Sequence, residues 1–169
     1  MPGQVKIFGL ALMLALAAPA EATDWKLQPA EASRGVVLTY GFGEPVSYRF
    51  ECAADQVIVT QIGVTKLLDL KTGSPIGDDG QAVMPPGAAM MALFSGKGEP
   101  RFMPAEALKN PAGGWNLTIR VPKSDKQLKA FGKSDMISLF TTGYTMAVPM
   151  DDAARAKWKD FMQRCEGAG

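Results

Sequence analysis

Val46-Ser47-Tyr48-Arg49-Phe50-Glu51-Cys52 alternates apolar and polar side chains at every second position. This period of two is typical of an antiparallel strand that buries one face. Residues 115–121 and 144–150 repeat the pattern. The chain is therefore predicted to be mainly β (α+β), with an antiparallel sheet that forms a sandwich or a partly open barrel.

Further β-rich runs extend this sheet. Residues 36–40 are expected to pair with 46–52 through a glycine-containing loop, and residues 137–140 to pair with 144–148. Gly63 is expected to join two separate strands. Residues 88–94 are compatible with a strand or a buried helix, and the flanking glycines favour a strand. The two runs on either side of Gly63 are residues 56–62 and 64–70.

Three short helices are predicted. Pro104 is expected to open a helix over residues 105–109. Ser124 and Gln127 form a capping-box pattern for residues 125–131. The last helix begins at Asp151 or Asp152 and is expected to pack on the sheet, because its apolar residues fall on one stripe. That stripe contains Ala154, Trp158, Phe161, Met162 and Cys165.

The first 22 residues have the order of a secretory signal peptide. Lys6 is the basic residue, and residues 7–18 are apolar but shorter than the about 20 residues of a membrane span. Small residues precede the expected cut after Ala22, with Ala20 as the alternative. Residues 23–169 are then one exported domain, periplasmic or secreted, without a transmembrane segment. A retained short membrane anchor is the other interpretation of this leader.

The two cysteines, Cys52 and Cys165, are predicted to form a disulfide. Exported proteins meet an oxidising compartment, where cysteine pairs are oxidised. Cys52 lies on the apolar face of a strand and Cys165 on the buried face of the last helix, so the two sulfurs can meet. Two free buried thiols are the alternative.

Composition excludes several classes of site. The chain contains no histidine, which removes the Ser-His-Asp triad and histidine-bearing metal sites. Its net charge of +1 gives no reason to expect a nucleic-acid partner. Met146 and Met150 point the same way and could offer thioethers to Cu(I), but core packing is the expected role. No catalytic, cofactor or metal residue is therefore assigned.

Carboxylates are the remaining acid–base candidates, and a hydrolase would need two of them facing each other across a cleft. The sequence does not select such a pair. The candidates are Glu44, Glu51, Asp55, Asp69 and Glu99. Glu51 alternates with Arg49 on the outward strand face, where a surface ion pair is expected.

The order of segments resembles small exported bacterial proteins of the invasion-associated locus B type. An aromatic strand ends in Cys52, a short helix closes with Gly132-Lys133, a hairpin follows over residues 138–148, and the last helix ends in Phe161-x-x-x-Cys165. The last feature is similar to other periplasmic proteins. The resemblance implies a compact β domain of the cell envelope that acts by binding.

These observations favour an exported, non-catalytic domain that binds a partner protein or an envelope component. Exposed edge strands and the turn-rich loop of residues 71–87 are its expected contact surfaces. A carboxylate-dependent hydrolase of cell-wall or polysaccharide material and a small-molecule carrier are the alternatives. The carrier is disfavoured because large residues such as Trp115 and Phe50 would fill a barrel.

Overall fold

The computed structural model describes residues 24–31, 35–41, 46–69, 72–76, 84 and 87–167. The predicted leader lies outside these ranges, as does most of the loop of residues 71–87. Within them the chain forms nine strands and two helices. These are β1 (Asp24–Glu31), β2 (Gly35–Gly41), β3 (Val46–Cys52), β4 (Gln56–Val64), β5 (Ala89–Phe94), β6 (Arg101–Lys109), β7 (Trp115–Pro122), α1 (Lys126–Phe131), β8 (Met136–Thr141), β9 (Tyr144–Pro149) and α2 (Asp152–Gly167).

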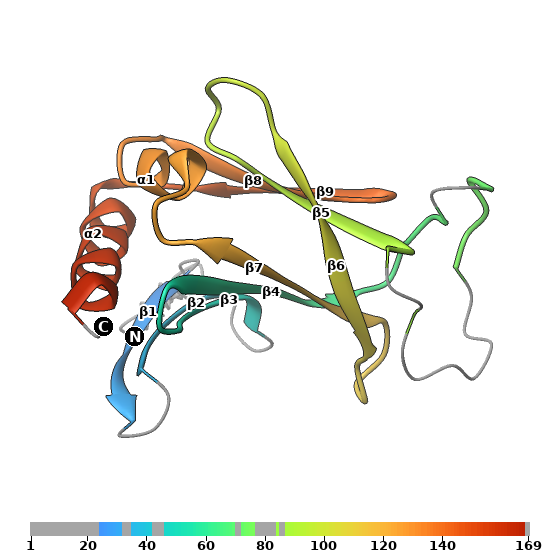
Figure 1. Ribbon diagram of the computed structural model, residues 1–169, viewed down its shortest axis with the longest axis horizontal. Helices are drawn as coiled ribbons and strands as arrows, with labels where there is room; N and C mark the ends of the chain where they lie inside the picture. Colours follow the sequence, from blue (N-terminus) through green and yellow to red (C-terminus); the bar gives the residue numbers. More distant parts are fainter. Residues whose placement is uncertain are drawn as a thin grey trace, which may run out of the picture.

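All nine strands belong to one curled antiparallel sheet, a half-barrel with α2 on its inner side (Figure 1). The strand order is β1-β2-β3-β4-β7-β6-β5-β8-β9. The predicted fold class is confirmed, as are the pairings of β2 with β3 and of β8 with β9. Strand β1, which the sequence patterns did not indicate, pairs with β2 at the edge of the sheet.

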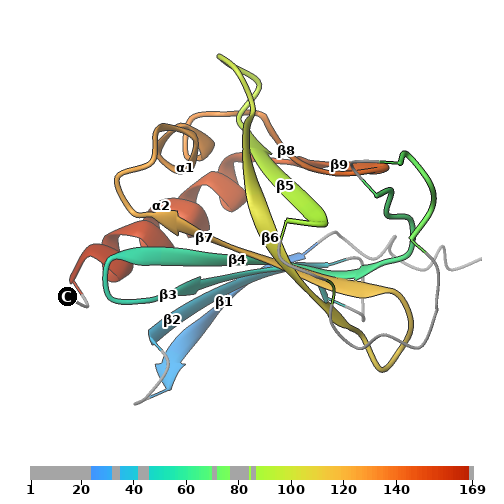
Figure 2. The same cartoon turned by 45° about the vertical axis from the view of Figure 1, so that its right-hand side comes forward.

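Strand β6 connects the two limbs of the half-barrel (Figure 2). Its first half pairs with β5, and its second half, from Glu106, pairs with β7. The helix predicted over residues 105–109 is therefore wrong. Ala105 and Ala107 point inward and Glu106 outward, so packing of the sheet overrides the helix propensity of a segment too short to be helical alone.

The boundary predicted at Gly63 is also wrong. Strand β4 continues through Gly63 to Val64, and the strand predicted over residues 64–70 is not formed among the described residues. On β4, two residues lie between Gln61 and Val64. On β7, only one residue lies between their partners, Leu117 and Trp115. Gly63 is therefore part of a β-bulge rather than of a turn between two strands.

Helix α1 is confirmed, but its capping differs from the prediction. The side chain of Asp125 accepts the backbone N–H of Gln127 at 2.8 Å, so Asp125 takes the role expected of Ser124. Helix α2 begins as predicted, because Asp151 Oδ1 accepts the N–H of Ala154 at 2.7 Å. Neither described helix has the length and hydropathy of a membrane span.

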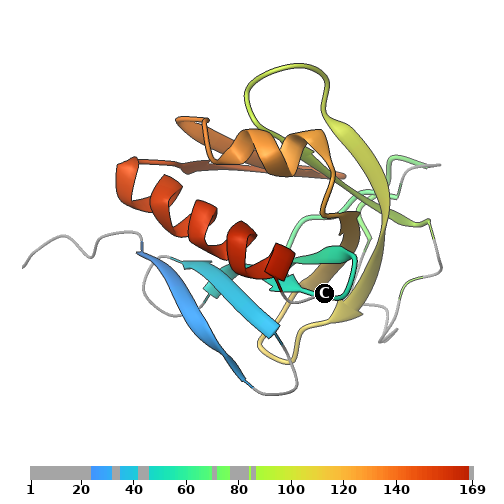
Figure 3. The same ribbon diagram turned by 60° about the vertical axis from the view of Figure 1, so that its left-hand side comes forward.

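Helix α2 lies between the strands β1 and β2 and the strands β8 and β9 (Figure 3), and its buried residues belong to the core. Trp158 is fully buried and packs edge-on against Phe50 and Phe131, with ring centroids 5.0 and 5.2 Å away. The predicted disulfide is present: Cys52 and Cys165 are bonded, with Cα atoms 5.4 Å apart. It joins the end of α2 to the end of β3.

Candidate functional site

Helix α1 lies next to α2 (Figures 1 and 3). Residues of α1 line two separate concave regions. One region, the Arg101 hollow, lies between α1 and the turn from β5 to β6. The other, the helix groove, lies between α1 and α2. Each receives lysines from α1 or from the residues that directly follow it.

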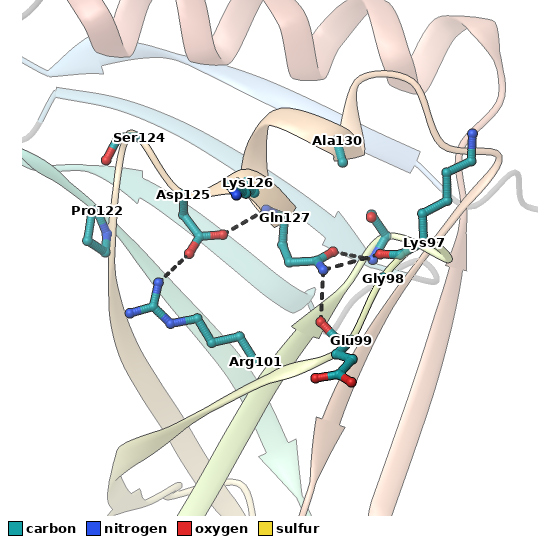
Figure 4. A pocket seen from close by; sticks show the side chains of 11 residues that line it. Lys97, Gly98, Glu99, Arg101, Pro122, Ser124, Asp125, Lys126, Gln127 and Ala130 are labelled. Carbon is teal, nitrogen blue, oxygen red and sulfur yellow. Dashed lines mark hydrogen bonds and ion pairs between the residues drawn. The ribbon is translucent and has the colours of Figure 1, made fainter.

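The Arg101 hollow has a volume of about 620 Å³. Its wall contains an ion pair in which Arg101 Nη1 lies 2.7 Å from Asp125 Oδ2 (Figure 4). The carboxylate of Asp125 is 5% exposed, whereas the guanidinium side chain of Arg101 is 58% exposed. Because Arg101 uses one N–H group on Asp125, its other donors remain available to a ligand in the hollow.

Gln127 connects α1 to the turn beneath the hollow (Figure 4). Its Oε1 accepts the backbone N–H of Ser95 at 2.8 Å. Its Nε2 donates to the carbonyls of Glu99 at 3.0 Å and Lys97 at 3.3 Å. These three hydrogen bonds hold the β5–β6 turn against α1, so this wall of the hollow is preformed.

The helix groove is smaller, about 270 Å³. Trp158 and the half-buried Met162 supply its apolar part, and Lys129, Lys133 and Lys159 supply its charge. Glu166 is the acidic residue of its lining. An apolar floor beneath lysines is suited to a ligand with an anionic group and a hydrocarbon portion.

Together the hollow and the groove form one basic surface around α1. Six cationic side chains line it, compared with three carboxylates, Glu99, Asp125 and Glu166. One of these carboxylates, Asp125, forms an ion pair with Arg101. None of the five lysines forms an ion pair with another described residue. We define the basic surface as Lys97, Arg101, Lys126, Lys129, Lys133 and Lys159.

Sequence reasoning missed this surface. Its signal was the cluster of Lys126, Lys129 and Lys133 in and directly after one short predicted helix. Overall charge concealed it, because a net charge of +1 says nothing about where the cations gather. The cations contributed by Lys97 and Arg101 come from another part of the chain and could not be placed.

The structure separates the candidate carboxylates. Glu51 pairs with Arg49 at 3.2 Å on the outer face, as predicted. Asp69 Oδ1 accepts the N–H of Thr72 at 2.8 Å and stabilises a turn. Asp55 is exposed, and Glu44 lies outside the described residues.

Only Glu99, of the five candidates, lines the Arg101 hollow, where it is accompanied by Asp125. Both oxygens of Asp125 are occupied, one by the Gln127 N–H and the other by Arg101. Asp125 therefore has a structural task in capping α1 and in orienting Arg101. This arrangement does not resemble two carboxylates that face each other across a substrate.

The two methionines considered for copper have different environments. Met150 is 1% exposed and belongs to the core, as expected. Met146 is half-buried and lines a separate concavity near the end of β4. The described residues include no group of three or more histidine, cysteine, aspartate or glutamate side chains that could hold a metal ion.

Comparisons with known proteins give no match: no family model, no curated protein sequence and no solved structure is similar to this chain.

Proposed function

We propose that the chain is an exported, non-catalytic domain that binds an anionic component of the cell envelope through the basic surface. The observation that carries this proposal is the gathering of six cations around α1, five of them lysines without an ion-pair partner among the described residues. Unpaired surface cations that converge on two hollows attract phosphate or carboxylate groups.

Export is supported by two independent features. Residues 1–22 have the order of a secretory leader. The Cys52–Cys165 disulfide is a bond that persists in oxidising compartments such as the periplasm. A protein located there meets lipid phosphates and acidic polymers of the envelope, which are the ligands that the basic surface suits.

The experiment is a vesicle co-sedimentation assay with the purified protein. We expect binding to vesicles that contain phosphatidylglycerol and none to vesicles of phosphatidylcholine alone. Each lysine near an anionic surface contributes about 1 kcal/mol. Replacing Lys126, Lys129 and Lys133 by Gln should therefore weaken binding about 100-fold.

A matched control removes three exposed cations elsewhere: Lys26 on β1, Lys66 after β4 and Arg120 on β7. If both triple variants weaken binding equally, only general charge matters and the basic surface is not the site. Polyglutamate as a soluble competitor distinguishes the source of the anion. Binding to polyglutamate without binding to vesicles would assign an acidic polymer or protein instead of a phospholipid surface.

A further inference from the structure

The second concavity, which we call the Gln61 pocket, lies where β4 ends and the β6–β7 hairpin turns. Its volume is about 440 Å³, within the usual range for small-molecule sites. The hairpin lies at the opposite end of the half-barrel from α2 (Figure 1). None of its lining residues belongs to the Arg101 hollow or the helix groove, so this site is separate from the basic surface.

Gln61 is a polar residue on the inner face of the sheet. It lies opposite Tyr48 on β3 and Leu117 on β7, and the residue is only 2% exposed. Its Oε1 is buried and has no hydrogen-bond partner among the described residues. A buried amide oxygen without a partner is costly, so the atom favours any ligand that brings an N–H or O–H donor.

The backbone around Gln61 is rigid. The bulge after Gln61 is held by the N–H of Gly63, which donates to Asn116 Oδ1 at 3.2 Å. In the facing hairpin, Asn110 Oδ1 accepts the N–H of Ala112 at 2.9 Å. Gly114 packs so closely that an added Cβ would lie 2.7 Å from the carbonyl oxygen of Val64. The backbone that frames the pocket is therefore preformed.

The lining of the pocket defines the chemistry of its ligand. It contains no ionisable side chain, so a charged ligand would lose its hydration without compensation. Hydroxyls of Ser47 and Thr65 and the amide of Asn110 can exchange hydrogen bonds with a neutral polar ligand. Ile62, Val64 and Met146 supply an apolar contact.

We propose that the Gln61 pocket binds a neutral sugar that carries an acetamido group. The amide N–H of such a group would donate to Gln61 Oε1 once the Gln61 side chain turns toward the pocket, since the oxygen itself is buried. The methyl group of the ligand would contact the apolar part of the lining. Sugar hydroxyls would meet the hydroxyls and amides at the rim. This proposal does not depend on the basic surface.

The test is an NMR titration of the ¹⁵N-labelled protein with N-acetylglucosamine. We expect chemical-shift changes at the amides of Gly63, Gly113 and Gly114. Glucose, which lacks the acetamido group, and glucosamine, which is charged, should bind about tenfold more weakly, the ratio expected for one hydrogen bond. Absence of shifts with N-acetylglucosamine at millimolar concentrations, or equal affinity for glucose, would overturn the proposal.

Two variants assign the effect to the pocket. Gln61→Leu removes the amide and should lower the affinity about tenfold or more, whereas Gln56→Leu on the same strand, outside the pocket, should leave it unchanged. Thr65→Val is a second test at an exposed rim residue that has no role in the core. An affinity that is unchanged in Gln61→Leu would refute the site. The triple lysine variant should retain sugar binding.

Discussion

The indole N–H of Trp158 donates to the backbone carbonyl of Leu128 at 3.1 Å, in a hydrogen bond buried inside the protein. Trp158 belongs to α2 and Leu128 to α1, and both side chains are buried. The bond therefore holds α1 against the last helix. Since α1 contributes Lys126 and Lys129 to the basic surface, the position of that surface depends on the core beneath it.

Replacing Trp158 by Phe should lower the free energy of unfolding by about 3 kcal/mol, because it deletes a buried hydrogen bond and leaves a small cavity. Trp25→Phe is the matched control. Trp25 is also buried, but its Nε1 has no hydrogen-bond partner among the described residues. We expect Trp25→Phe to cost about 1 to 2 kcal/mol less. Urea unfolding measures both, and equal losses would show that the hydrogen bond contributes little.

The disulfide should contribute strongly to stability, since Cys52 and Cys165 are separated by 113 residues. Chain entropy assigns a loop of this length nearly 5 kcal/mol, as an upper figure. The double variant Cys52→Ala/Cys165→Ala should therefore unfold at a much lower urea concentration than the oxidised protein. Reductant should destabilise the wild type and leave the double variant unchanged. Wild-type protein insensitive to reductant would contradict this expectation.

Local patterns predicted much of the sheet and the last helix. Strands β3, β7 and β9 and helix α2 each bury one face. Burial of one face produces a periodic pattern of apolar residues, which can be seen in the sequence alone. The disulfide followed from placing Cys52 and Cys165 on two such buried faces. These features required no knowledge of which strands are neighbours.

The errors occurred where tertiary contacts decide the local structure. Ala105 and Ala107 are good helix formers, yet they lie in β6, where both are buried and the strand changes partner from β5 to β7. Gly63 resembled a turn residue, and only its pairing with β7 shows that it belongs to a bulge. The same limit applies to the sites: Lys97 and Lys126 line one hollow because segments that are distant in the sequence pack together.

Gln61→Leu should raise the stability of the protein even as it weakens ligand binding. The substitution replaces a buried amide whose Oε1 has no partner among the described residues with an apolar side chain of similar size. We expect a gain of about 1 kcal/mol in the free energy of unfolding. Gln56→Leu on the same strand should change stability little. A loss of stability in Gln61→Leu would mean that the amide has a structural partner.

Gly114 should tolerate substitution less well than its neighbour Gly113. Both have positive φ, so alanine at either position costs about 1 to 2 kcal/mol of backbone strain. A Cβ on Gly114 would also lie 2.7 Å from the Val64 carbonyl oxygen, whereas a Cβ on Gly113 meets nothing within 4 Å. Gly114→Ala should therefore be the less stable variant by about 2 kcal/mol. Equal melting temperatures would argue against close packing of the hairpin on the bulge.

Asp125→Asn should strengthen binding to anionic vesicles. Asparagine caps a helix about as well as aspartate and can still accept the Gln127 N–H, so α1 should persist. The substitution removes the carboxylate that lies 2.7 Å from Arg101 and leaves that cation free for a ligand. One additional cation near the vesicle surface contributes about 1 kcal/mol, or about fivefold in affinity. Glu51→Gln, which frees Arg49 on the outer face with the same change of charge, should give a smaller gain. If the two variants bind equally, the ion pair with Asp125 does not restrain Arg101, and the hollow contributes nothing specific to binding.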